Sequence, residues 1–187
     1  MIRSTIRKSQ KGFTLAELCA AMAVSGVLAA VGMPAMASFN GKAVVTAQSE
    51  GLMSALRLAR NEAVSRGEQV SVCAMDPASA ESGEPKCLAR GKNWSAGWIV
   101  FVDRDDRGDI DDADHVVSVQ QAPAPAGVVG TGRFVTYRPT GVLLSGMGHF
   151  RVLAPGQQLL DRDVPGAALI CLNKTGRPRI AGEPDCN

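Results

Sequence analysis

The chain carries one acidic residue, Glu17, inside an apolar segment that follows a short basic leader. Segment 13–39 holds no other charged residue, and a helix over it would be roughly 40 Å long, more than the ~30 Å of a bilayer core. A carboxylate in such a segment is costly and is usually paired or functional. Cleavage between Gly12 and Phe13 would create an α-amino group close to Glu17, or to the Glu17 of a neighbouring chain. That amine would supply the missing counter-charge.

This arrangement resembles the class III signal of type IV pilins and of type II secretion pseudopilins. The signal combines a cationic leader, here 1–12, with Gly before the cleavage point, Phe after it and Glu at the fifth mature position. The resemblance implies that a prepilin peptidase cuts between Gly12 and Phe13 and N-methylates Phe13. It also implies that Glu17 pairs with a neighbour's amino terminus during assembly. The alternative is an ordinary secretory signal cut after Ala35-Met36-Ala37, which the charge of Glu17 disfavours.

Removal of the leader changes the balance of charge. The full chain has 20 Lys and Arg against 18 Asp and Glu, and four of the basic residues lie in 1–12, which leaves 16 against 18, or a net charge of −2. The part beyond residue 67 is long enough for one small globular domain. Aromatic residues make up only 4% of the chain, so covalent bracing would help its modest core.

Five cysteines form two local pairs and one outlier. The pairs are Cys73 with Cys87 and Cys171 with Cys186, while Cys19 lies in the apolar segment. Four cysteines in an exported domain indicate two disulfides, and the short loops favour the local pairs among the three connectivities. Zinc is the alternative, but there is no Cys-x-x-Cys, and the two histidines lie far from either pair in the sequence.

Periodicity divides the rest of the chain into a helix and a β domain. Apolar residues recur every three or four positions, which predicts an amphipathic helix over 40–67 that continues the apolar one and ends at Gly67. Short runs of Val, Ile and Phe then alternate with Gly, Pro and Asp, which predicts antiparallel strands. The predicted strands are 69–73, 98–102, 115–119, 134–138, 149–153, 167–172 and 177–180, and the predicted connecting loop is 121–132.

The predicted fold class is therefore α+β, with a long N-terminal helix packed on a C-terminal antiparallel β domain. The expected divisions are a leader (1–12), a transmembrane or filament-core helix (13–39), an amphipathic helix (40–67) and a periplasmic β-rich head (68–187). Three further segments resemble the GspH/FimT group of minor pilins and pseudopilins, which implies the pilin fold. They are Ala59-Arg60-Asn61-Glu62-Ala63, Gly97-Trp98-Ile99-Val100-Phe101-Val102-Asp103 and Thr175-Gly176-Arg177-Pro178-Arg179.

The turn at 173–175 and the strand predicted after it place three cations, Lys174, Arg177 and Arg179, on one tip. Such groups bind the phosphates of nucleic acid without regard to base sequence. In the FimT branch a Gly-Arg-x-Arg motif is associated with DNA binding during natural transformation, and Arg177 and Arg179 match it. The alternative is a hairpin that displays solvated arginines at a sheet edge, which also deters aggregation.

Residues 103–114 contain seven aspartates and follow part of the spacing of a calcium-binding loop. The candidate ligands are Asp103, Asp105, Asp111 and Asp114. Arg107 occupies a ligand position, and the last residue is Asp where a bidentate Glu is preferred. An acidic hairpin loop is therefore the alternative, and apart from calcium no cofactor is expected.

The chain has no nucleophile elbow and no phosphate-cradling loop, so an enzyme is not expected. The resemblance implies a minor pilin, a structural or initiating subunit of a type IV pilus-like filament. It would wait in the inner membrane with a periplasmic head and then enter the filament. The expected partners are other pilins or pseudopilins, prepilin peptidase and the inner-membrane assembly platform, with DNA as a further candidate. The alternatives are a type II secretion pseudopilin and a FimT-like DNA-binding minor pilin.

Overall fold

The computed structural model describes residues 14–105, 108–121, 127–157, 166–181 and 186, without the side chains of 31–35, 37, 38, 80 and 81. The predicted processing residues, Gly12 and Phe13, lie outside this set. The chain divides into two compact units, Met1–Asn40 and Gly41–Asn187. Helix α1 (Leu15–Arg66) contributes its first part to one unit and its second part to the other.

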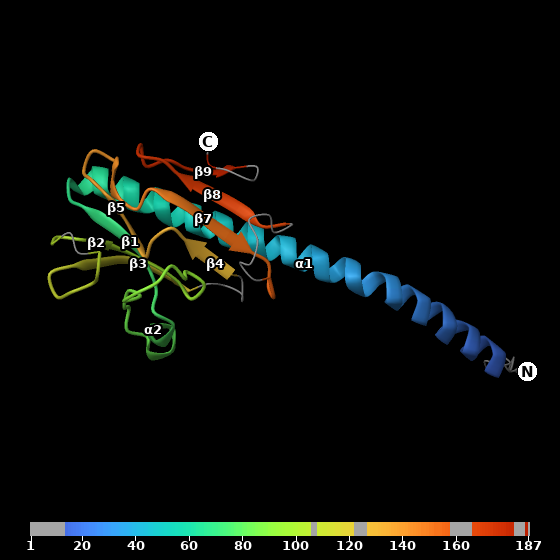
Figure 1. Ribbon diagram of the computed structural model, residues 1–187. Coiled ribbons are helices and arrows are strands. Elements are labelled where there is room, and N and C mark those ends of the chain that lie inside the picture. The colour runs from blue at the N-terminus through green and yellow to red at the C-terminus, as the bar shows by residue number, and fades with distance from the viewer. Residues whose placement is uncertain (1–13, 106–107, 122–126, 158–165, 182–185, 187) are drawn as a thin grey trace, which may run out of the picture. The chain divides into compact units, whose positions relative to one another are not determined.

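The second unit is an α+β structure in which the helix packs on antiparallel sheets (Figure 1). In the described part, a five-stranded sheet has the order β3-β2-β1-β5-β6 and a four-stranded sheet the order β4-β7-β8-β9. A short helix, α2 (Pro77–Ser82), follows the first strand. The strands are β1 (Val70–Ala74), β2 (Gly97–Val102), β3 (His115–Gln121), β4 (Gly127–Gly130), β5 (Phe134–Tyr137), β6 (Leu143–Ser145), β7 (Gly148–Leu153), β8 (Ala168–Leu172) and β9 (Pro178–Ala181).

The second part of α1 buries one stripe of small and aliphatic side chains. Leu52, Leu56, Ala59 and Ala63 are fully excluded from solvent, and their spacing of four, three and four residues follows the helical repeat. The helix ends as predicted, because Gly67 adopts a φ of 70° and its N–H donates to the Ala63 carbonyl at 3.1 Å. A left-handed residue after the last helical turn is a common way to stop a helix.

Strands β1 and β2 are buried on both faces. Alternate residues, such as Val72 and Val100, join the main core with α1. The intervening residues Cys73, Ile99 and Phe101 form a smaller cluster. Because successive side chains of a strand point to opposite faces, these two strands form the centre of the head.

The prediction of a connecting loop over 121–132 is wrong, because β4 lies inside it and pairs with β7. The glycines that suggested a loop serve packing instead. A Cβ on Gly130 would lie 2.8 Å from Trp94 Nε1 and 2.9 Å from Phe150 Cε1, so two aromatic rings require the bare backbone. Strand β6 was not predicted, since three residues are too few to show a period.

The first part of α1 presents apolar side chains to the outside. All side chains over 14–30 are exposed, including those of Leu15, Met22 and Leu28. Within the part of the chain that the structure describes, no helix combines the length and the apolarity needed to cross a membrane.

Candidate functional site

The start of α1 is closed by a reciprocal pair, Thr14 and Glu17. The Thr14 N–H donates to Glu17 Oε2 at 2.9 Å, and the Glu17 N–H donates to Thr14 Oγ1 at 3.3 Å. This is a capping box, in which the N-cap residue just before the helix and the residue three positions later satisfy each other's backbone donors. Sequence reasoning missed this local role, although the Thr-x-x-Glu spacing signals it.

The capping box leaves part of the Glu17 carboxylate available. The Thr14 hydroxyl also donates to Glu17 Oε2, at 3.0 Å, and no described residue donates to Oε1. An acidic group with one unused oxygen therefore lies at the start of a helix whose apolar side chains are exposed. An apolar surface of this kind normally meets lipid or other protein.

Two disulfides brace the second unit. Cys73 is bonded to Cys87 and Cys171 to Cys186, which are the two local pairs. The first ties β1 to the segment after α2, and the second ties β8 to the end of the described chain. Cys19 is free and exposed.

The turn between β8 and β9 is pressed against the turn between β5 and β6. Gly176 has a φ of 76°, and its N–H donates to the Asn173 carbonyl at 2.9 Å. A Cβ on Gly176 would lie 2.6 Å from the Gly141 carbonyl oxygen and 2.8 Å from Cε1 of Tyr137. Only glycine allows this close approach, which fixes where the following residue, Arg177, leaves the turn.

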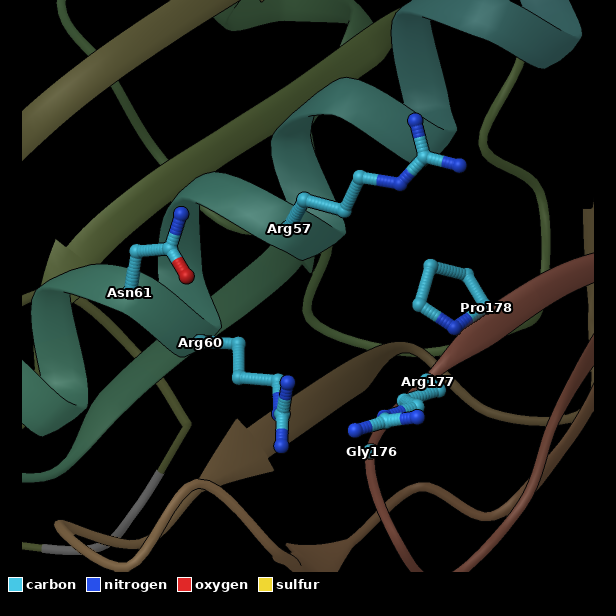
Figure 2. Close-up of a pocket in the computed structure, with 6 residues that line it drawn as sticks. All are labelled: Arg57, Arg60, Asn61, Gly176, Arg177 and Pro178. Atoms are coloured by element: carbon cyan, nitrogen blue, oxygen red, sulfur yellow. The ribbon is translucent and has the colours of Figure 1, made fainter.

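A pocket of about 440 Å³ lies between this turn and the second part of α1. The described lining residues come from the helix on one side and from the turn and the start of β9 on the other (Figure 2). They are Arg57, Arg60 and Asn61 from the helix, and Gly176, Arg177 and Pro178 from the turn and β9. Three of the six are arginines and none is acidic, so the pocket is strongly cationic.

The arginines differ in how they are held. Arg60 is half-buried, and its Nε donates to the Gly141 carbonyl at 2.8 Å. Arg57 and Arg177 are exposed, and neither has a hydrogen-bond or ion-pair partner among the described residues. One guanidinium is therefore fixed in place, while the other two are uncommitted.

The cations predicted to share one tip have different surroundings. Arg177 lines the pocket, whereas Arg179 lies on β9 and donates from Nη2 to the Cys186 carbonyl at 3.0 Å. Lys174 is exposed in the turn itself. Arg57 and Arg60 line the same pocket as Arg177, and sequence reasoning missed both. Their spacing of three on a helix, which places both side chains on one face, was the available signal.

Tyr137 lies behind the pocket, against Gly176. It is completely buried, and its hydroxyl has no hydrogen-bond partner in the described structure. Burial raises the pKa of the Tyr137 hydroxyl strongly, and the positive charge of Arg60 offsets only part of that rise. The hydroxyl therefore stays neutral, and the pocket keeps its positive charge.

The acidic segment between β2 and β3 begins with a buried carboxylate. Asp103 is 1% exposed, and its Oδ2 accepts from the Ser71 hydroxyl at 2.6 Å and from the Gly108 N–H at 3.0 Å. Ser71 shares a further hydrogen bond of 2.7 Å with the Thr136 hydroxyl. Asp103 thus ties the acidic loop to strands β1 and β5.

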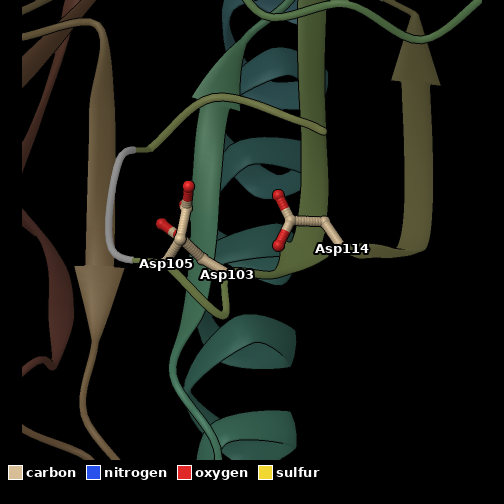
Figure 3. Close-up of side chains that lie close together, drawn as sticks. All are labelled: Asp103, Asp105 and Asp114. Atoms are coloured by element: carbon tan, nitrogen blue, oxygen red, sulfur yellow. The ribbon is translucent and has the colours of Figure 1, made fainter. Parts of the chain in front are cut away.

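Of the four predicted calcium ligands, the structure brings together Asp103, Asp105 and Asp114, whose nearest carboxylate oxygens lie within 4.8 Å of one another (Figure 3). Asp111 is not in this group, and its Oδ1 accepts from the Ala113 N–H at 2.7 Å. Calcium binding stays a prediction.

Asp114 accepts two hydrogen bonds that hold the loop in place. Its two oxygens accept from the N–H groups of Arg104, at 3.0 Å, and Asp111, at 3.2 Å. Burial raises the pKa of the Asp114 carboxyl and the negative charges of Asp111 and Asp103 add to the rise, while the two backbone hydrogen bonds oppose it.

Comparison with known proteins gives two family matches. Residues 48–176 match the family described as Type II transport protein GspH, and residues 7–33 match the Prokaryotic N-terminal methylation motif. The first match covers more than half of the chain, including α1 from Gln48 onward and most of the head. The second covers the segment around Glu17.

Two curated Pseudomonas aeruginosa proteins, each named Fimbrial protein, are 41% identical to this chain over 64 residues. The matched part is 34% of this chain, and the chain spans only 40% of the length of these relatives. Among solved structures, the type IV minor pilin FimU of P. aeruginosa strain PAO1 aligns with a TM-score of 0.56 at 17% identity. The alignment covers 77% of this chain and 92% of that one. At this identity the likeness concerns the fold, which is that of a pilin.

Proposed function

The chain belongs to the GspH family of type II transport proteins, and on that premise we propose that it is a minor pilin of a type IV pilus-like filament. Its family and fold are those of structural pilins and pseudopilins. In this proposal the subunit is held in the inner membrane by residues 13–39, with its head in the periplasm. The assembly platform then moves it into a filament with other pilins.

The observation that carries this proposal is the N-terminal methylation motif over 7–33, which contains Glu17. The free Oε1 of Glu17 supports an ion pair with the amine of a neighbouring subunit. Both charges would leave water together, and such a pair is favourable only when each finds its partner. Glu17 would therefore report whether a neighbour lies in the correct axial register.

The ion pair can be tested apart from the capping box. Glu17→Gln keeps an oxygen that can cap the helix but removes the charge, because Glu and Gln both serve in capping boxes. Thr14→Val removes the hydroxyl from the cap and keeps the charge. We expect Glu17→Gln, like Glu17→Ala, to be processed and stable but absent from filaments, and Thr14→Val to be incorporated.

The measurement is the amount of subunit in sheared filaments, relative to the amount in membranes, in a strain lacking the native copy. Glu17→Gln at the wild-type level in filaments would contradict the proposed pairing. Loss of Thr14→Val together with Glu17→Gln would contradict it too, because the cap would then be the cause.

Processing by prepilin peptidase is part of the same proposal. The mature protein should begin at Phe13 with a methylated amine, which N-terminal mass spectrometry of the membrane-bound form measures. A mature terminus at Ser38 would instead indicate an ordinary secretory signal. A chain that retained the cationic leader would lack the amine on which assembly depends.

A pseudopilin of a type II secretion system is the second candidate, and the description of the matched family favours it. The fimbrial proteins from P. aeruginosa favour the pilus. A deletion strain separates the two, because loss of twitching motility with normal enzyme secretion indicates the pilus. Loss of secreted enzymes with normal motility indicates the secretion system.

DNA contact is a third candidate, supported by the exposed position of Arg177 beside two further arginines. The hydrogen bond of Arg179 to the Cys186 carbonyl makes its guanidinium less available. Arg177→Ala should therefore weaken DNA binding by the full chain in detergent more than Arg179→Ala does. Binding unchanged in both variants would remove the Gly-Arg-x-Arg motif from this role.

A further inference from the structure

We propose that the pocket formed by Arg57, Arg60 and Arg177 is a binding site for a phosphate group. All three residues belong to the unit Gly41–Asn187. Two come from one face of α1 and the third from the turn before β9, so the site exists only in the folded head. The proposal concerns this pocket alone and does not depend on the filament role.

The lining of the pocket has a geometry that suits an anion. Figure 2 shows the side chains of Arg60 and Arg177 extending toward each other, while the side chain of Arg57 runs along the helix toward the end of the pocket where Pro178 lies. The bond from Arg60 Nε to the Gly141 carbonyl at 2.8 Å fixes one guanidinium. A donor whose direction is already fixed loses little entropy when an acceptor arrives.

The charge around the pocket is unbalanced. None of the six described lining residues is acidic, and the two turns that meet here, 138–142 and 173–177, contain no Asp or Glu. These turns contribute two more cations, Arg138 and Lys174, both exposed. Neighbouring like charges repel, and an anion that binds between them relieves the repulsion.

The number of arginines favours phosphate over carboxylate as the bound group. One guanidinium satisfies a carboxylate with two parallel hydrogen bonds, so a carboxylate does not require a second or a third guanidinium. A phosphate presents more acceptor oxygens, arranged so that donors can approach from several directions. Three arginines around one cavity suit that shape. At about 440 Å³ the pocket also has room for the groups attached to a phosphate ester.

Two sources share this chemistry, the backbone of a nucleic acid and a free phosphate ion. The test uses the full chain in detergent micelles and two probes, inorganic phosphate and a short fluorescent single-stranded oligonucleotide. The variants are Arg57→Ala and Arg177→Ala. The control is Arg90→Ala, which removes one exposed charge outside the pocket. Arg60 is left intact in these variants, because its contact with Gly141 also supports the fold.

We expect each pocket variant to weaken binding of at least one probe by roughly tenfold, and Arg90→Ala to change it less than twofold. If the oligonucleotide is the true source, the salt dependence of its binding will also become shallower by about one charge in each pocket variant. If only inorganic phosphate responds to the pocket variants, the pocket binds a small anion and the DNA role fails separately.

Three results would overturn the proposal. The first is that neither probe binds to the wild-type chain. The second is that Arg57→Ala and Arg177→Ala bind both probes as tightly as Arg90→Ala does. The third is that a glutamate-rich peptide displaces the probe as effectively as phosphate does at equal concentration of acidic groups, because the site would then be a receptor for carboxylates.

Discussion

Two charged regions of the head use their charges in opposite ways. In the acidic loop between β2 and β3, Asp103, Asp111 and Asp114 accept hydrogen bonds from backbone or hydroxyl donors of the same molecule. In the pocket beside α1, Arg57 and Arg177 have no partner among the described residues. The charges of the first region stabilise the fold, whereas those of the second region stay available to a ligand.

The difference shows why the count of charges is a poor guide to function. The aspartates of 103–114 form the densest run of charge in the sequence. In the structure, however, several of them accept hydrogen bonds that hold the loop in place. The arginines of the pocket are scattered in the sequence and become a group only when the chain folds. A charge without a partner in the folded state is therefore more informative than a charged run.

The largest expected effect is the loss of the buried acid. Asp103→Ala removes the acceptor of the Ser71 hydroxyl and of the Gly108 N–H, which would be left buried and only partly satisfied. We expect the free energy of unfolding to fall by about 3 kcal/mol. Denaturation in urea measures it, with the exposed Asp112→Ala as a control expected to change stability by less than about 0.5 kcal/mol. Equal effects of the two substitutions would erase the contrast between buried and surface acids.

The next effect concerns the residue behind the pocket, Tyr137. Because burial raises its pKa in the folded state above the unfolded value, its neutral form stabilises the fold fully below the unfolded pKa of about 10. That stability is lost as pH rises from there toward the folded pKa. We expect a loss of about 1–2 kcal/mol between pH ~10 and pH ~11.5 that is absent in Tyr137→Phe.

The measurement is simple because Tyr137 is the only tyrosine of the chain, so the ultraviolet absorbance of phenolate reports this group alone. Titration of the folded chain near the ordinary tyrosine pKa would show that the hydroxyl is not sealed behind the pocket. A pH dependence of stability equal in wild type and Tyr137→Phe would assign the loss to lysines instead.

Much of the fold follows from local pattern. The second part of α1 was predicted from its apolar period, and its end from Gly67. Strand β4 was missed because a glycine at a strand position looks the same in sequence as a glycine in a loop. The reason for Gly130, close contact with Trp94 and Phe150, exists only in the tertiary structure.

The candidate sites were predictable to different degrees. Glu17 was singled out because a lone charge in an apolar segment is conspicuous, but its bond to Thr14 was overlooked in favour of an intermolecular partner. The pocket was not predictable, since Arg57 and Arg177 are far apart in the sequence. They meet because Gly176 packs on Gly141 and Tyr137, an approach that no local pattern encodes.

A smaller effect is expected at the surface of the acidic region. Asp109 accepts hydrogen bonds from both terminal nitrogens of Arg133, with Nη2 to Oδ2 at 2.9 Å, and about half of the Asp109 side chain is exposed. Since solvent screens such a pair, a double-mutant cycle with Asp109→Ala and Arg133→Ala should give a coupling free energy of about 0.5–1 kcal/mol. The same cycle with Asp112 in place of Asp109 should give about zero. Equal coupling in both cycles would mean that the loop acts through its total charge and not through defined contacts.

The smallest effect is expected in the cationic pocket, and it is the most direct test of the contrast. If Arg57 and Arg177 do no work in the fold, replacing either with Ala should change the free energy of unfolding by less than about 0.5 kcal/mol. At low salt the change should be toward greater stability, because repulsion between the guanidinium groups is relieved, and added salt should remove this gain by screening. Denaturation at two ionic strengths measures both. A loss of stability above about 1 kcal/mol would show that the arginines are already engaged within the protein, and the pocket would then belong with the acidic loop as part of the scaffold.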